Sequence, residues 1–153
     1  MHVLELKIPP PAVALLMAAI MWLGTWLVPA LTYRVPGHSV VALAAALSGA
    51  MIDVVSVVAF RRAGTTVNPM KPDTSSSLVV SGIYTRTRNP MYLGLLLILL
   101  GWAIYLSNAM AFLLLPGFIW YINRFQIEPE EKALASRFGA QFDSYASRVP
   151  RWL

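Results

Sequence analysis

The sequence contains no cysteine and is poor in charge. The absence of cysteine excludes disulfides, thiolate metal sites and thiol catalysis. Charged residues make up 12% of the 153 residues and hydrophobic residues 58%, whereas about a quarter of a typical soluble domain is charged. This composition predicts an integral membrane protein.

Several common catalytic and binding motifs are also missing. There is no phosphate-binding glycine loop, no histidine cluster for a metal, and no serine with a partner histidine. The net charge of +5 does not indicate nucleic-acid binding, because the basic residues flank apolar runs instead of forming a stripe of their own. We therefore expect no metal and no nucleic-acid partner.

Four apolar segments are present, and each approaches the length needed to cross a hydrocarbon core of about 30 Å. They cover residues 12–33, 39–60, 90–107 and 109–125. The minimal turn between the last two predicts an antiparallel hairpin, and small residues in the second would let neighbouring helices approach closely. The expected fold is therefore all-α and integral to the membrane, with four transmembrane helices.

A further helix is expected over residues 126–148. Its apolar residues recur at spacings of four, four and three: Leu134, Phe138, Phe142 and Tyr145. This stripe predicts an amphipathic helix that lies along the membrane interface, and the glutamates that precede it would occupy its first turn, at the positive end of the helix dipole. We expect one domain, residues 1–153, with its catalytic part at about 61–153.

The basic residues predict the orientation of the four spans. With an even number of spans, both termini and the loop of residues 61–89 share one side, and that side carries every lysine and arginine except Arg34. By the positive-inside rule it is the cytoplasmic side. The protein is then a multi-pass membrane protein whose termini and site face the cytoplasm.

One acid, Asp53, lies inside the second apolar segment. An acid within a span is costly and is by default a functional candidate. The alternative is that Asp53 is hydrated, or paired with Arg61 or Arg62, near the cytoplasmic end. Two other classes of function stay open here: a small four-span ion-coupled transporter that uses Asp53 as its carrier, and a noncatalytic membrane scaffold.

The stretch from Gly82 to Gly94 combines two arginines with a proline that can open a helix and with tyrosines. Arginines bind carboxylates, carboxylates attract cations, and tyrosine rings attract cations as well. Together with the later glutamates, this set suits a zwitterionic or cationic ligand such as S-adenosylmethionine. The alternative is a belt of snorkelling arginines and aromatic residues at the membrane interface.

The order of motifs adds a resemblance. The sequence resembles the isoprenylcysteine carboxyl methyltransferase family of membrane methyltransferases, whose general plan related phospholipid N-methyltransferases share. The residues that carry the resemblance are Arg88-Asn89-Pro90-Met91-Tyr92-Leu93-Gly94, then Asn108, the pair Glu130-Glu131, Phe138, Gly139, Tyr145 and Arg148-Val149-Pro150. Asn89 stands where the family pattern has histidine, so a titrating group at that position is not general.

The resemblance implies methyl transfer from S-adenosylmethionine to a lipophilic or lipidated acceptor in the bilayer, a carboxylate or an amine. Carried over by position, the cofactor-binding residues are Asn89, Pro90, Met91, Tyr92, Gly94, Asn108, Glu130 and Glu131. The residues expected in catalysis are Arg88, Arg124 and Glu131. Of these, Arg88 and Arg124 would face the substrate or the cofactor carboxylate, and Glu131 would hold polar groups of the cofactor. The acids of the C-terminal helix are expected to fold back over Arg88 and Tyr92.

Overall fold

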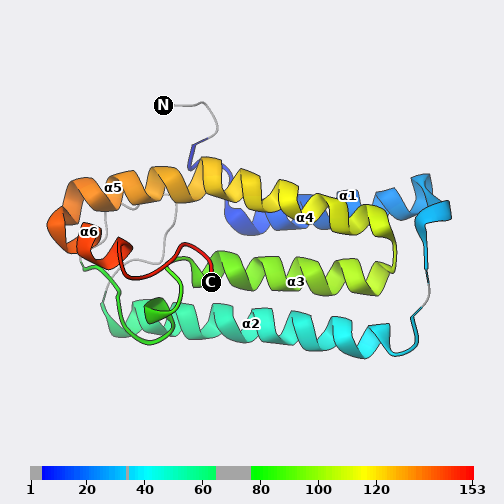
Figure 1. Ribbon diagram of the computed structural model, residues 1–153, viewed down its shortest axis with the longest axis horizontal. Coiled ribbons are helices and arrows are strands. Elements are labelled where there is room, and N and C mark those ends of the chain that lie inside the picture. Colours follow the sequence, from blue (N-terminus) through cyan, green and yellow to red (C-terminus); the bar gives the residue numbers. More distant parts are fainter. Residues whose placement is uncertain (1–4, 34, 65–76) are drawn as a thin grey trace.

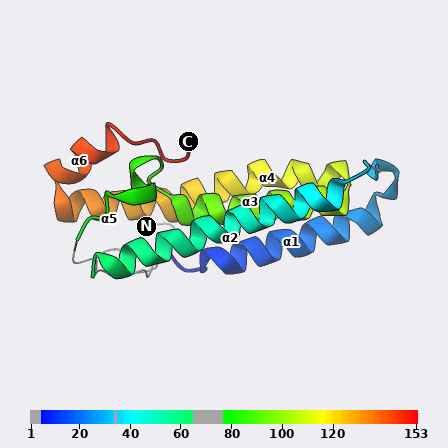
Figure 2. The ribbon, with the colours of Figure 1, turned by 90° about the horizontal axis from the view of Figure 1, so that it is seen from below.

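A computed structural model describes residues 5–33, 35–64 and 77–153 of the chain. Four long helices lie side by side along the molecule (Figures 1 and 2). They are α1 (Pro10–Leu27), α2 (His38–Arg62), α3 (Pro90–Leu106) and α4 (Ala109–Ile122). Arg34 and Lys71, which entered the predicted topology, lie outside the described residues.

Shorter helices gather mainly at one end of these four. They are the 3-10 helices η1 (Pro29–Leu31) and η3 (Gly82–Thr85), the π-helix η4 (Asn123–Ile127), and α5 (Glu128–Phe138) and α6 (Ala140–Ala146). Within the described ranges the only β-pairing is an isolated bridge between Thr32 and Asn108. The expected all-α fold is thus confirmed for the part of the chain that is described.

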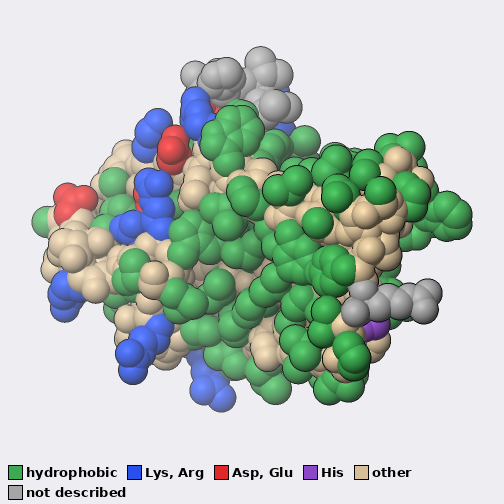
Figure 3. Space-filling view, turned by 45° about the vertical axis from the view of Figure 1, so that its right-hand side comes forward, with side chains coloured by type: hydrophobic (Ala, Val, Ile, Leu, Met, Phe, Trp, Pro, Cys, Tyr) green, Lys and Arg blue, Asp and Glu red, His purple; other side chains and the backbone are tan. Residues whose placement is uncertain are grey.

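The outer surface of the helices is apolar. By length and composition α1 and α2 can each cross a membrane, and α3 is a shorter apolar helix. Large apolar side chains such as Leu15, Trp26 and Val40 are at least 70% exposed, and Figure 3 shows hydrophobic side chains covering most of the visible face, with charged ones at the α5 and α6 end. Soluble proteins do not expose so much apolar surface, so the chain is a membrane protein.

Helix α3 is the centre of the fold, because it contacts α1, α2 and α4. Its contact with α2 depends on small residues: a Cβ atom added to Gly101 would lie 2.6 Å from the carbonyl oxygen of Ala42. At the other end of the contact, a Cβ on Gly94 would lie 2.8 Å from the carbonyl oxygen of Gly49. The predicted close approach of the second segment to a neighbour is therefore present.

The helix boundaries agree with the predicted spans for α2 and α3 and differ for α1. Helix α1 ends at Leu27 and is followed by η1, so the first span is shorter than residues 12–33. Between α3 and α4, Ser107 adopts a left-handed conformation (φ 50°), and the side chain of Asn108 caps α4 by accepting a hydrogen bond from the backbone N–H of Met110. The predicted hairpin is confirmed.

The C-terminal part corrects the predicted helix of residues 126–148 in two ways. Helix α4 runs through the π-helix directly into α5, and Ile127 has helical angles (φ −64°, ψ −48°). The glutamates of α5 therefore do not sit at a free helix start. Further on, Gly139 (φ 50°) ends α5, and α6 turns back. Phe142 and Tyr145 consequently pack against Leu134 and Phe138 in a small cluster within the protein.

Candidate functional site

The acids at the start of α5 meet the start of α3. The hydroxyl of Tyr92 donates a hydrogen bond to Oε1 of Glu130, and Nη2 of Arg88 lies 3.0 Å from Oε1 of Glu131. The π-helix before α5 contributes to this meeting, since one residue more or less in a helix rotates everything after it by about 100°. The structure thus brings together four of the residues predicted from the sequence.

Glu131 is shared between two arginines. Besides Arg88, the guanidinium of Arg151 binds it through two nitrogens, with Nη2 at 2.7 Å from Oε2 and Nε at 3.1 Å from the same oxygen. The side chain of Glu131 is only 17% exposed. Arg88 has a further feature: its Nε is buried and has no hydrogen-bond partner among the described residues.

The last residues of the chain lie across the start of α3, and the C-terminus is drawn beside it in Figure 1. Thr87 Oγ1 and Asn89 Nδ2 each donate a hydrogen bond of 2.9 Å to the carbonyl oxygen of Arg151. The backbone N–H of Arg88 donates to the carbonyl oxygen of Pro150 at 2.9 Å. Asn89, which stands where the family pattern has histidine, therefore holds the C-terminal tail by a side-chain hydrogen bond.

Burial raises the pKa of Glu130 from its ordinary value to about 8; the hydrogen bond from Tyr92 opposes this rise, and the negative charge of Glu131 adds to it. The carboxyl is consequently neutral at pH 7 when no cation is near. A positive charge placed beside it would favour the ionised form. Glu130 is thus suited to respond to a cationic ligand.

Two titratable side chains lie near this meeting point of α3 and α5: Asp53 from α2 and Tyr84 from η3. The Oδ1 atom of Asp53 lies against Gly94, where a Cβ would overlap it, and no described residue forms a hydrogen bond with it. The alternative of an ion pair between Asp53 and Arg61 or Arg62 is not seen among the described residues. Tyr84 is buried, which raises its pKa. A side-chain hydrogen bond with Ser56 opposes this rise, and electrostatic interactions with Tyr145, Glu130 and Asp53 add to it.

Two predicted site residues lie elsewhere. Arg124 is on η4 and faces Glu5 at 3.3 Å and Glu128 at 3.4 Å; no described contact joins it to the residues around Glu131. Asn108 lies at the opposite end of α3, a helix of 17 residues, which corresponds to about 25 Å. Its Nδ2 donates 3.0 Å hydrogen bonds to Val28 and Thr32. Asn108 therefore lies apart from the residues around Glu131, and its place in the cofactor site stays a prediction.

The remaining predicted residues lie in the first turns of α3. Pro90 is buried at the first helical position, where its missing N–H is not needed, and Met91 is half-buried. Gly94 faces α2 rather than the acids of α5. The sequence analysis did not name Tyr84 or Arg151 as site residues. Tyr84 carries no signal of its own in the sequence. Arg151 has one signal, which is its position directly after the Arg-Val-Pro motif.

Comparison with known proteins identifies the family of the chain. The sequence model of the phospholipid methyltransferase family matches residues 38–141. The chain belongs to this family. The match to the phospholipid methyltransferase family includes Asp53, Arg88, Tyr92 and both glutamates, and it ends before the C-terminal tail. No solved structure matches the chain.

Individual relatives cover parts of the chain. An uncharacterized protein of Haemophilus influenzae is 51% identical over 63 residues, which are 41% of this chain and all of that protein. The protein-S-isoprenylcysteine O-methyltransferase of Schizosaccharomyces pombe is 36% identical over 73 residues (48% of this chain, 31% of that protein). Protein-S-isoprenylcysteine O-methyltransferase B of Arabidopsis thaliana is 28% identical over 102 residues (67% and 52%). The chain thus spans between about a third and about half of these named methyltransferases.

Proposed function

We propose that this protein is an integral membrane methyltransferase that uses S-adenosylmethionine and a lipophilic acceptor. The observation that carries the proposal is the meeting of Glu130 and Glu131 with Tyr92 and Arg88 at the start of α3, inside the region that matches the phospholipid methyltransferase family. The whole chain would act as one domain, with its catalytic part at about residues 61–153.

The residues present fit S-adenosylmethionine, which carries a sulfonium, an ammonium and a carboxylate. The buried Nε of Arg88 has no hydrogen-bond partner in the part of the chain that the structure describes, and a ligand carboxylate would satisfy it with a charge-assisted hydrogen bond. Glu130, neutral when alone, would ionise beside a positive group. The proposed cofactor-binding residues are therefore Arg88, Tyr92, Glu130 and Glu131.

S-adenosylmethionine, when bound, supplies an electrophilic methyl group on its sulfonium. The protein supplies position and shelter. Glu130 and the ring of Tyr92 beside it would attract the positive groups of the cofactor. Arg88 and Arg151 keep the carboxylate of Glu131 in place. The C-terminal tail covers the start of α3 and keeps water away. Most of the rate would come from alignment of the acceptor in a sheltered site.

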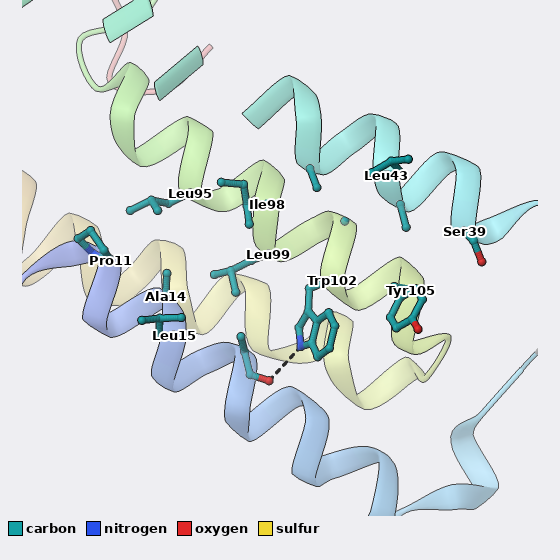
Figure 4. Close-up of a pocket in the computed structure, with 14 residues that line it drawn as sticks. Pro11, Ala14, Leu15, Ser39, Leu43, Leu95, Ile98, Leu99, Trp102 and Tyr105 are labelled. Atoms are coloured by element: carbon teal, nitrogen blue, oxygen red, sulfur yellow. Dashed lines mark hydrogen bonds between the residues drawn. The ribbon is translucent and has the colours of Figure 1, made fainter. Parts of the chain in front are cut away.

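The helices form an apolar groove that would hold the acceptor. A groove of about 740 Å³ lies between α1 and α2 with α3 as its floor (Figure 4). Its lining includes Ala14, Leu43, Ile98 and Trp102, and it reaches Leu95, the neighbour of Gly94. Because the groove is open and apolar, it would accept a hydrocarbon chain from the bilayer. This supports a lipophilic acceptor.

The proposal includes an orientation of the helices in the membrane. Helices α1 to α4 cross the bilayer, and the end that carries α5 faces the cytoplasm, since the basic residues concentrate there. The amphipathic α5 and α6 then lie at the membrane surface. The reactive groups would meet the cofactor from the cytoplasm and the acceptor from the lipid.

Calorimetry with S-adenosylmethionine and the protein in neutral detergent tests the proposal, followed by transfer of a labelled methyl group to lipid extracts. We expect saturable binding and label in a lipid product. Ion-coupled flux in vesicles without cofactor binding would instead support the transporter, and the absence of both would leave the scaffold. Either outcome would refute the methyltransferase.

A further inference from the structure

Three aromatic side chains join α2, η3 and α6 at the end of the molecule that carries α5. The rings of Phe60, near the end of α2, and Tyr84 of η3 lie edge to face, with their centroids 5.4 Å apart. The hydroxyl of Tyr145 on α6 donates a hydrogen bond of 2.7 Å to the carbonyl oxygen of Tyr84. The residues next to these three in the chain therefore lie at one corner of the molecule.

Four exposed arginines follow these aromatic residues closely in the chain. They are Arg61, Arg62, Arg86 and Arg148, which we call the arginine cluster. Two of them belong to the last turn of α2, one ends η3, and one comes shortly after α6. Figure 3 shows basic side chains at this end of the molecule. The corner at which α2, η3 and α6 meet is therefore positively charged.

The acids of the described ranges do not neutralise the arginine cluster. None of them forms an ion pair with any of the four arginines. Asp143, the one acid of α6, is itself exposed. Because like charges gathered at one surface repel one another, an anion that binds among them is attracted by all of them. The cluster is thus suited to an anionic partner.

An apolar strip on α2 leads to the arginine cluster. Val54 and Val58 are 60% and 38% exposed, and their spacing to Arg61 and Arg62 places all four residues on one face of the helix. Helix α2 is long and apolar enough to cross a membrane, so this face would meet lipid. A phospholipid has the same order of groups, with hydrocarbon chains that end in a phosphate at the membrane surface. A free anion would contact the arginines alone, whereas a lipid would contact both parts.

We propose that the arginine cluster binds the phosphate of an anionic phospholipid, whose hydrocarbon chains lie along Val54 and Val58. Guanidinium groups bind phosphate oxygens through two parallel N–H groups, and each basic residue at a membrane surface adds to the attraction for anionic lipid. The lipid is a structural partner and not the methyl acceptor, so the inference does not depend on methyl transfer. Because it bridges α2, η3 and α6, it holds the contact between Tyr84 and Tyr145 at the membrane surface.

Native mass spectrometry of the full chain in neutral detergent, without cofactor, tests this inference. Phosphatidylglycerol and phosphatidylcholine with identical acyl chains are titrated, and we expect the wild type to prefer phosphatidylglycerol. Arg61→Gln and Arg148→Gln should each weaken phosphatidylglycerol binding about fivefold, since one arginine is lost, and leave phosphatidylcholine binding unchanged. Arg61→Lys, which keeps the charge, should bind phosphatidylglycerol more tightly than Arg61→Gln. Lys7→Gln, which removes an exposed charge ahead of α1, should bind both lipids as the wild type does.

The opposite results would overturn the inference. Equal affinity for phosphatidylglycerol in the wild type, Arg61→Gln and Arg148→Gln would show that the arginine cluster does not hold the headgroup. An equal loss in Lys7→Gln would show that only the net charge of the protein matters. Displacement of phosphatidylglycerol by millimolar inorganic phosphate would identify a free anion as the partner, and binding of polyglutamate without any preference between the two lipids would identify an acidic protein. Thermal unfolding in detergent verifies that the variants are folded, as expected for substitutions of exposed residues.

Discussion

The two ends of α3 are both polar, but they differ in how their polar groups are satisfied. At the Asn108 end, the side-chain amide and its oxygen bind Val28, Thr32 and Met110. At the Tyr92 end, Arg88 and Asp53 each leave a buried atom without a partner. Two more such atoms, on Tyr121 and Gln126, also lie in the half of the molecule that leads into α5. A satisfied cluster stabilises a fold, whereas an unsatisfied one is suited to a ligand.

The largest expected effect concerns the unsatisfied end. Arg88→Ala removes the charge that would bind a ligand carboxylate, and we expect the affinity for S-adenosylmethionine to fall about 100-fold, or about 2.7 kcal/mol. Isothermal titration measures this. Arg86→Ala is the control, because Arg86 is exposed and two residues away. If both variants bind the cofactor equally well, the ligand does not use this end of α3.

The satisfied end should show the opposite behaviour. Asn108→Ala removes a helix cap and the side-chain hydrogen bonds to Val28 and Thr32, while the carbonyl of Val28 keeps the hydrogen bond from the backbone N–H of Leu31. The loss should lower the free energy of unfolding by about 2 kcal/mol. Denaturant titration in detergent micelles measures it, with Ser48→Ala on the exposed side of α2 as control. Cofactor affinity should stay within about twofold. A selective loss of cofactor affinity without loss of stability would place Asn108 in the site.

The pH dependence of stability and of cofactor binding should also distinguish the Tyr92 end of α3. The pKa of Glu130 is raised to about 8 in the folded protein, so the ligand-free protein should lose stability as the pH rises from about 4.5, the ordinary glutamate range, through about 8. Binding of a cation requires the ionised form, so affinity for S-adenosylmethionine should rise by up to about tenfold per pH unit between pH 6 and 8. Glu130→Gln should flatten both profiles. Identical slopes in variant and wild type would show that Glu130 does not face the cation.

The sequence predicted some of these features for clear physical reasons. The bounds of α2 and α3 follow from apolar length and from Pro90, which suits a first helical turn. The continuity of α4 with α5 was hidden, because Pro129 has no N–H and is typical of a helix start; the wider π-turn before it lets the helix continue. The apolar spacing runs on across Gly139, so periodicity could not reveal the break there.

At the candidate site, too, the sequence predicted some contacts and not others. The meeting of Glu130 and Glu131 with the start of α3 was expected from the order of motifs, since helices of a hairpin return to the same end. Which end a motif residue occupies was less clear: Asn108 matched the family pattern, yet the hairpin turn lies a full helix away from the acids. Contacts of Arg151 with Glu131 depend on the path of the tail, which carries no periodic pattern.

The smallest expected effect concerns the tail that covers the unsatisfied end. Asn89→Ala removes one of two side-chain hydrogen bonds to the carbonyl of Arg151 and leaves that of Thr87, so the tail should be weakened by about 1 kcal/mol, or about fivefold in its open fraction. Carboxypeptidase release of Leu153 and Trp152 measures this, because cleavage follows the open population. The exposed Ser147 provides the control variant Ser147→Ala. Cofactor should slow release in the wild type if the tail closes over the bound ligand. An unchanged rate in Asn89→Ala would show that the hydrogen bond of Asn89 does not hold the tail.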